Sequence, residues 1–394
     1  MQSGRVAAIS IITFGLISLF GDIIYEGSRS IISPFLLGFG ASAFIVGVVL
    51  GLGEFLGYAL RIVFGVLSDK TRSYWTIFIA GYSLLIAVPL LAFAGSWPLA
   101  MFLILVERLS KAVRSPARDT VFSYATRGVG SGKAFGIHEL LDQIGAVTGP
   151  AIVAAVLFTT GQNFNSAFSI LFLPYLLMII VALYAYVKLR PLVGIPIATK
   201  KRAALRGLPQ EFIIYAVAVA LNAMGLVSIG LILYRVSPEV LPWLVALIYL
   251  LAQAVDAVAA PLAGYLYDRM GRKLLYLPFA LSVAPSTLIF MPGLEFVLLA
   301  AILFGAIFGM HESIYRAAVA DLTPMELRGS AYGVFHTFYG LGLLISGAVF
   351  GFLMDNDLAQ VAILFSVLTQ ASAMFLLRKT LRASAQNQTT KTTS

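Results

Sequence analysis

Twelve long apolar runs, several with acidic and basic residues inside them, constrain what this chain of 394 residues can fold into. Most runs are long enough for an α-helix to cross about 30 Å of hydrocarbon, which takes roughly 20 residues. An ionisable side chain inside a membrane is costly, and by default it marks a pathway or a coupling site. We therefore expect the embedded charges to carry the function. The runs cover residues 7–36, 43–66, 75–95, 99–118, 133–158, 166–188, 210–234, 241–265, 274–292, 296–318, 329–353 and 359–377.

The composition predicts an all-α polytopic membrane protein. Hydrophobic residues make up 60% of the chain and charged residues 11%, whereas a soluble domain carries about 25% charged residues. The chain has no cysteine, which excludes disulfides, thiolate metal sites and cysteine nucleophiles. No cofactor and no bound metal are expected. The net charge of +9 does not indicate a nucleic-acid partner, because the basic residues gather in alternate loops.

The loops that lack lysine and arginine predict the orientation in the membrane. Every second loop is basic, and Arg235 is the one clear exception to this alternation. By the positive-inside rule, the basic loops and both termini lie in the cytoplasm. We therefore predict a multi-pass protein of the cytoplasmic membrane of the cell. The loops without lysine or arginine lie at residues 38–42, 95–98, 159–165, 292–295 and 355–358.

A segment with three prolines and a basic cluster divides the chain into two similar halves. Residues 65–70 correspond to residues 264–269, and residues 132–136 correspond to residues 329–333. Duplicated six-helix halves with a site near the membrane midplane are typical of alternating access, although repeats can also build a static bundle. The predicted parts are an N-terminal six-helix bundle at 1–188, a cytoplasmic linker at 189–209, a C-terminal six-helix bundle at 210–382 and a disordered cytoplasmic tail at 383–394.

The loops after the second and eighth runs share a motif of glycine, aspartate and basic residues. The motif resembles the loop signature of the major facilitator superfamily, and the resemblance covers essentially the whole chain. It implies the major facilitator fold, with twelve transmembrane helices in two pseudo-symmetric six-helix halves, and a gate-latch role for this loop. The matching residues are Gly264, Leu266, Asp268, Arg269, Gly271, Arg272 and Lys273, and in the first half Gly65, Leu67 and Asp69, where Lys70 and Arg72 follow without the later glycine.

The fifth run carries a second, partial match. Gly136, Gly145, Gly149 and Pro150 resemble the motif of the proton-coupled drug antiporters of this superfamily, although the closing glycine pair is absent. Small residues permit close helix approach, and proline kinks a helix. A packing groove is therefore the alternative to an antiporter motif.

The fourth run resembles the helix of this family that holds a buried arginine, here Arg108. Arg108 lies about ten residues into the run, which at roughly 1.5 Å per residue is near the membrane centre. Arg114 and Arg118 follow near the predicted cytoplasmic end of the same run. We interpret these two as latch or interface charges rather than ligands.

In this family the first, fourth, seventh and tenth helices line the central cavity, with help from the second, fifth, eighth and eleventh. Asp22, Glu26 and Arg29 are spaced i, i+4 and i+7, so they share one helix face. The first half holds more ionisable residues than the second, which suggests that it handles most of the protons. The candidate residues for proton coupling and the substrate cavity are Asp22, Tyr25, Glu26, Arg29, Glu54, Tyr58, Arg108, His138, Glu139, Asp142, Asn222, Asp256, His311, Glu312 and His336.

These charges suggest how a carrier would bind and release protons. Low dielectric raises the pKa of a carboxylate and a nearby arginine lowers it, so making or breaking such a pair moves a proton. Asp22 and Glu26 are the preferred proton carriers, followed by Asp142, with Arg108 as a counter-charge. Purely structural pairing of these carboxylates with arginines is the alternative.

The sequence therefore favours a secondary transporter that exports an amphipathic or cationic compound in exchange for protons. No ATP-binding phosphate loop is present. The arginines would suit an organic anion, and the histidines and carboxylates a divalent metal. A non-transporting sensor and a membrane enzyme remain alternative classes, and the zinc-protease motif is absent. The expected partners are a small-molecule substrate, protons and the bilayer, with the monomer as the working unit.

Overall fold

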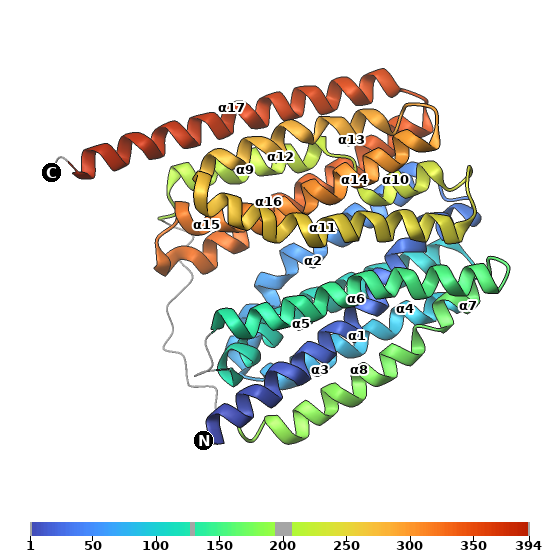
Figure 1. Ribbon diagram of the computed structural model, residues 1–394, viewed down its shortest axis with the longest axis horizontal. Coiled ribbons are helices and arrows are strands. Elements are labelled where there is room, and N and C mark those ends of the chain that lie inside the picture. The colour runs from blue at the N-terminus through green and yellow to red at the C-terminus, as the bar shows by residue number, and fades with distance from the viewer. Residues whose placement is uncertain (1, 127–130, 194–206, 393–394) are drawn as a thin grey trace. The chain divides into compact units, whose positions relative to one another are not determined.

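The computed structural model describes residues 2–126, 131–193 and 207–392, and within these ranges the secondary structure is entirely helical (Figure 1). Most of the predicted linker, residues 194–206, lies outside the described residues. The first six predicted crossings are α1 (Gln2–Gly38), α2 (Ala43–Thr71), α3 (Tyr74–Ser83) with η1 (Leu84–Ile86), α4 (Ala87–Leu90) and η2 (Leu91–Phe93), α5 (Trp97–Ala125), α6 (Ser131–Thr159), and α7 (Phe164–Ser169) with α8 (Phe172–Tyr184) and η3 (Ala185–Leu189).

The second half repeats this plan with more interruptions. Its α17 continues as helix to Thr392, through most of the tail that the sequence predicts to be disordered. The crossings are α9 (Gln210–Gly225) with α10 (Ile229–Val236), α11 (Pro242–Met270), η4 (Gly271–Leu275) with α12 (Tyr276–Leu281) and α13 (Val283–Leu288), α14 (Leu294–Met310) with η5 (His311–Tyr315) and α15 (Arg316–Leu322), η6 (Met325–Leu327) with α16 (Arg328–Asp355), and α17 (Ala359–Thr392).

Length and hydropathy single out ten helical stretches of the described chain as able to cross a membrane. One of them, residues 242–288, spans 47 residues and holds two crossings. It divides at Gly271, whose φ of 61° is a conformation that glycine adopts without strain. The helix α5 is long enough for a crossing, but its six charged residues make it too polar to be counted among the ten. With these two corrections, the described residues accommodate the twelve predicted crossings.

Arg72 occupies the position of the first half that corresponds to Gly271 of the second half. The loop motif lacks its glycine there, yet the backbone turns in the same left-handed way, with a φ of 56° at Arg72. A residue with a Cβ is strained in this region. The two halves therefore make the same turn. In the first half the turn is strained, because an arginine stands where the second half has a glycine.

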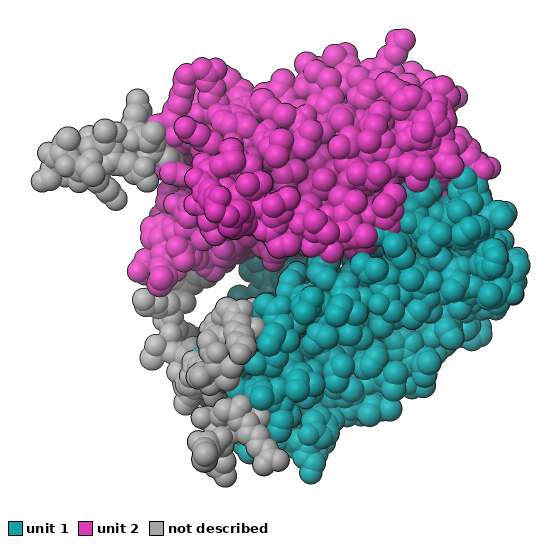
Figure 2. Space-filling model, in the orientation of Figure 1, with its two compact units in different colours: residues 1–41, 59–200, 240–250 teal, residues 42–58, 201–239, 251–394 magenta. Residues whose placement is uncertain are grey.

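Contacts divide the chain into two compact units that do not follow the order of the sequence (Figure 2). Unit 1 consists of residues 1–41, 59–200 and 240–250, and unit 2 of residues 42–58, 201–239 and 251–394. Both α2 and α11 are thus shared, each giving its first part to the unit of the other half. The hydropathy pattern cannot predict this exchange, because it reports burial and not which helix covers which.

Close backbone approach holds α1 against α6 in unit 1. A Cβ added to Gly145 would lie 2.5 Å from the carbonyl oxygen of Leu19, and one on Gly149 would lie 2.5 Å from that of Ile23. Around Gly136, by contrast, no atom lies within 4 Å of an added Cβ. Two of the three motif glycines therefore serve helix packing, as the alternative explanation of the motif proposes.

Unit 2 holds the first part of α2 in an equally tight crossing. A Cβ on Gly47 would lie 2.0 Å from the carbonyl oxygen of Gly347 in α16. The carboxylate of Asp355, at the end of α16, accepts hydrogen bonds of 2.8 Å from the backbone N–H groups of Ala43 and Phe44. A carboxylate at this position satisfies two of the N–H groups that a helix start leaves unpaired.

Candidate functional site

Unit 1 gathers carboxylates and cations from α1, α5 and α6 within its membrane-spanning part. Asp22 and Glu26 lie one turn apart on α1, and both are buried. Asp142 of α6 lies within electrostatic range of Asp22, as do Lys111 and Arg114 of α5. The structure thus brings together the three carboxylates that the sequence predicts as proton carriers.

Glu26 has two partners in unit 1. Its Oε1 lies 3.3 Å from Nη1 of Arg29, one turn along the same helix. Its Oε2 accepts a close hydrogen bond from the phenol of Tyr249, which α11 supplies from its first part. Only 5% of Glu26 and 2% of Tyr249 are exposed. Sequence reasoning missed Tyr249, because a tyrosine in an apolar run is typical of core packing.

Arg108 contacts its own neighbour. Its Nε lies 3.2 Å from Oε2 of Glu107, and both side chains are almost fully buried. Arg108 also lies within electrostatic range of Tyr249. This ion pair lies within α5, and the role of Arg108 as a counter-charge to the carboxylates of α1 stays a prediction. Glu107 was not among the predicted site residues.

A tyrosine of α1 carries two cations of α5 on its ring. Nζ of Lys111 lies 4.9 Å from the ring centre of Tyr25, and the guanidinium of Arg114 lies 5.7 Å from it. Arg114 also lies 5.0 Å from the ring centre of Tyr82 and donates to the hydroxyl of Ser110 over 2.9 Å. Cations over aromatic faces are held by the ring quadrupole. The structure places Arg114 in this buried cluster.

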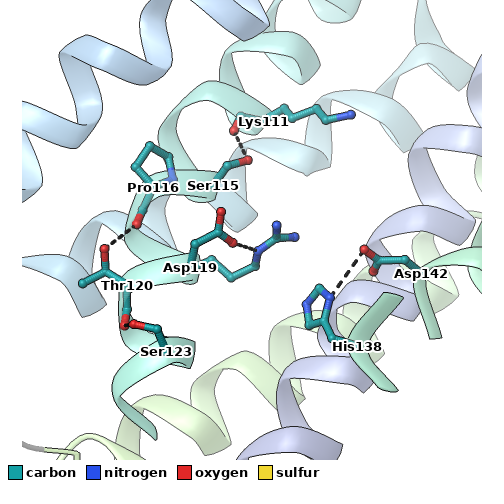
Figure 3. A network of polar contacts seen from close by, with 9 residues as sticks. Lys111, Ser115, Pro116, Asp119, Thr120, Ser123, His138 and Asp142 are labelled. Carbon is teal, nitrogen blue, oxygen red and sulfur yellow. Dashed lines mark hydrogen bonds and ion pairs between the residues drawn. The ribbon is translucent and has the colours of Figure 1, made fainter. Parts of the chain in front are cut away.

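Figure 3 shows how α5 and α6 continue the cluster. Nδ1 of His138 lies 3.5 Å from Oδ2 of Asp142, one turn away on α6. Arg118 pairs with its neighbour Asp119 over 2.9 Å. Glu139, which the sequence groups with His138, is exposed and lies within electrostatic range of His138.

Unit 2 carries a cluster of a different kind, rich in aromatic rings. Tyr58, at the end of the α2 part in this unit, stacks on His336 with ring centres 5.1 Å apart. It also meets Tyr339 edge to face at 5.5 Å. Nδ1 of His311 lies 3.2 Å from the hydroxyl of Tyr339, and its ring stacks on Tyr315 at 4.3 Å.

Three carboxylates surround this aromatic cluster. Glu54, Asp256 and Glu312 all lie within electrostatic range of Tyr339. They come from α2, α11 and η5, so three segments that are distant in the sequence converge on one ring. The structure brings the other predicted site residues of this unit together, and Asn222 is linked to them through Tyr315.

Asn222 is fully engaged in a buried hydrogen-bond network. Its Oδ1 accepts from the hydroxyl of Tyr315 over 2.7 Å, and its Nδ2 donates to Gln370 over 2.7 Å and to Ser282 over 3.1 Å. Gln370 in turn donates to the carbonyl oxygen of Asn222. Buried polar groups that satisfy one another in this way fix the packing of a core. Asn222 therefore ties several helices of unit 2 together, and its role in the substrate cavity stays a prediction.

Of the predicted latch residues, Arg114 and Arg118 belong to the unit 1 cluster, and the others lie in the two loop motifs. Asp69 accepts a hydrogen bond of 2.8 Å from the hydroxyl of Tyr74, and Arg269 lies over the ring of Tyr265 at 4.3 Å. Asp69, Arg72, Asp268 and Arg269 are exposed, while Arg272, Gly65 and Gly264 are half-buried. Their latch role stays a prediction. Among the described residues, no group of three or more histidine, aspartate or glutamate side chains is placed to hold a metal ion.

Comparison with known proteins places the chain in a family. The model of the major facilitator superfamily matches residues 211–393. An uncharacterized protein of Mycobacterium tuberculosis is 37% identical over 362 residues, covering 89% of this chain and 88% of the relative. An uncharacterized MFS-type transporter of Methanocaldococcus jannaschii is 25% identical, covering 95% of this chain and 96% of the relative. The chain belongs to the major facilitator superfamily.

Solved structures agree on the fold. The nucleoside transporter NupG, in a mutant form, has a TM-score of 0.76 at 14% identity, with 93% of this chain and 99% of that chain covered. A mutant of the peptide transporter POT in complex with sulfate also has a TM-score of 0.76, at 13% identity, with 97% and 98% covered. These likenesses show the fold. Membership of the superfamily makes the chain a multi-pass membrane transporter.

Proposed function

We propose that this transporter exports an amphipathic or cationic compound by alternating access, in exchange for protons that move inward. It would work as a monomer in the cytoplasmic membrane, with both termini in the cytoplasm. The observation that carries the proposal is the cluster of Asp22, Glu26 and Asp142 among the cations of α5, buried inside the membrane-spanning part of unit 1.

Proton coupling follows from the chemistry of this cluster. A carboxylate that exchanges a cationic partner for apolar surroundings changes its affinity for a proton. Asp22 and Glu26 have cations on neighbouring turns and on α5, so a small helix movement changes the charge around them. Such a cluster binds a proton in one conformation and releases it in another.

The unit 2 cluster supports the substrate class. Tyr58, Tyr339 and His336 present rings, and Glu54, Asp256 and Glu312 supply negative charge around them. Aromatic faces attract ammonium and guanidinium groups, by about 2 kcal/mol or more when water is excluded. Rings and carboxylates together favour a lipophilic cation.

One observation favours an organic anion instead. Lys111 and Arg114 lie over Tyr25 in unit 1, where they would attract a carboxylate or phosphate group. The two substrate classes are distinguished by adding each class separately in one transport assay.

The test uses proteoliposomes that hold a pH-sensitive dye. A proton gradient is imposed, lipophilic cations and organic anions are added separately, and wild type is compared with Asp22→Asn and Glu26→Gln. We expect cations to drive proton movement in wild type and in the exposed control Glu326→Gln, and the movement to be lost in both site variants. Substrate movement without proton flux, unchanged in both variants, would refute the coupling.

A further inference from the structure

The segment of residues 240–250, which contains the first turns of α11 (Pro242–Met270), contacts the rest of unit 1 at two points. At its start, the backbone N–H of Trp243 donates to Oε1 of Gln162 over 3.1 Å, and its ring meets Phe158 at 5.2 Å. At its end, the phenol of Tyr249 donates to Glu26. The remainder of α11 belongs to unit 2, so this one helix takes part in both units.

The second fastening depends on a titratable group, whereas the first does not. An ionised carboxylate only accepts hydrogen bonds, and a bond from a phenol to a charged acceptor is about twice as strong as a neutral one. A protonated Glu26 would be a neutral and weaker acceptor for Tyr249. The phenol of Tyr249 has no water to turn to, because the residue is 2% exposed.

The segment has one face turned to this contact. Val245 and Ala246 lie four and three residues before Tyr249, which places them on the same side of the helix. Both are fully buried, whereas Leu247 is exposed. Loss of the Tyr249 bond would therefore loosen a continuous buried stripe.

Several charged groups lie close enough to Glu26 or its partner Tyr249 to change the affinity of Glu26 for a proton. Arg29 and Asp22 lie on its own helix, and Arg108 lies within electrostatic range of its partner Tyr249. The midpoint of a pH-dependent change at Glu26 is therefore a property of all these interacting groups together. The titratable and charged groups around the pair are Asp22, Tyr25 and Arg29 of α1, Glu107, Arg108, Lys111 and Arg114 of α5, and Asp142 of α6.

From these contacts we propose that Tyr249 is the residue through which the protonation state of Glu26 controls the first part of α11. Ionised Glu26 holds residues 240–250 on unit 1, and protonated Glu26 releases them. The proposal deepens the proton-coupled function proposed above and rests on it for its role in transport. Tyr249 is a positioning residue, because it acts through Glu26 and not on the substrate.

The test exploits the natural absence of cysteine. A single cysteine at Ala246 reports whether the stripe opens, through its rate of modification by N-ethylmaleimide in purified protein without substrate. A cysteine at the exposed Ser96 corrects for the ordinary effect of pH on thiol reactivity. The corrected rate is measured from acidic to alkaline pH in the backgrounds of wild type, Tyr249→Phe and Glu26→Gln.

We expect the corrected rate at Ala246→Cys to be low at alkaline pH in the wild-type background and to rise on acidification. Tyr249→Phe keeps the ring and removes only the hydroxyl, so its rate should be high at every pH. The difference from wild type at alkaline pH should be roughly tenfold or more, as for loss of a hydrogen bond to a charged group. Glu26→Gln should give the same flat profile, and the double variant should add little to either single one.

Tyr267→Phe is the matched control on the same helix. Its phenol donates to Asp321 over 2.9 Å, so it loses a bond of the same kind outside residues 240–250. It should keep the wild-type pH profile. A wild-type profile in Tyr249→Phe would overturn the proposal, and so would a flat profile in the wild-type background. If Tyr249→Phe is not recovered as folded protein, Glu26→Gln decides by the same criteria.

The assay needs no transport, so its result is separate from that of the proposed function. A pH-dependent rate that Tyr249→Phe abolishes supports the role of Tyr249 even where no substrate moves protons. If transport is coupled to protons but the pH profile of cysteine modification in Tyr249→Phe equals that of wild type, the role of Tyr249 is wrong and the proposed function stands.

Discussion

Unit 1 and unit 2 each hold ionisable groups inside membrane-spanning helices, but the two sets differ in composition. In unit 1, Asp22 and Glu26 lie among the cations Arg29, Lys111 and Arg114. In unit 2, carboxylates surround tyrosine and histidine rings. A carboxylate beside a basic side chain can either form an ion pair or bind a proton. Carboxylates beside aromatic rings instead form a binding site for a cation. Under the proposed function, unit 1 couples transport to protons and unit 2 binds the cation.

The largest expected effect comes from breaking the buried pair of unit 1. Arg108→Met leaves Glu107 as a buried carboxylate without its neighbouring cation, which costs about 3–5 kcal/mol. We expect a strongly reduced yield of monodisperse protein and a much lower unfolding temperature in detergent. The double variant Arg108→Met with Glu107→Leu should recover most of the loss. Failure of the second substitution to rescue the first would show that Arg108 acts through other partners.

A second effect tests whether the α6 motif of unit 1 is a packing surface. Gly145→Ala places a Cβ 2.5 Å from a backbone oxygen of α1, so overpacking should cost about 1–3 kcal/mol. Gly136→Ala, in the same motif but with open space around it, should cost nothing measurable. Thermal unfolding of the two variants compares them directly. Equal stability would contradict the packing role of Gly145.

A third effect sharpens the assignment of the cation to unit 2. Tyr58→Leu removes a ring that stacks on His336, and a cation–π contact is worth about 0.5–2 kcal/mol. The apparent affinity for a lipophilic cation, measured by transport at varied concentration, should fall by roughly 2- to 30-fold. Tyr58→Phe keeps the ring and should stay close to wild type. An equal loss in both variants would point to the hydroxyl and away from the ring.

The smallest effect concerns the matching loops of the two halves. Arg72 adopts the left-handed conformation that Gly271 adopts in the second half. The strain of a left-handed residue with a Cβ is roughly 1–2 kcal/mol. A glycine removes this strain but also raises the entropy of the unfolded chain, which offsets part of the gain in stability. Arg72→Gly should therefore stabilise the protein by less than about 1 kcal/mol, seen as a small rise in unfolding temperature. A fall would mean that the Arg72 side chain makes contacts worth more than the strain.

The sequence predicts the helices well because the membrane imposes a minimum apolar length on each crossing. It also singles out Asp22, Glu26 and Asp142 as candidate proton carriers, and the structure brings these three residues together. It fails for Tyr249, whose role depends on the first part of α11 packing in the unit of the other half. It does not predict that Glu139 is exposed while the adjacent His138 is buried, because that depends on which helices cover α6.

The π-helical turn at His311–Tyr315 has a consequence for how a helical wheel represents the tenth crossing. A π-turn contains one more residue than an α-turn, and each residue of an α-helix advances the direction of the side chain by about 100°. A wheel drawn continuously from Leu294 to Leu322 therefore assigns the residues after Tyr315 to the wrong side. Loss of one residue from the widened turn would shift the phase of α15 by that angle and present a different set of side chains to α16.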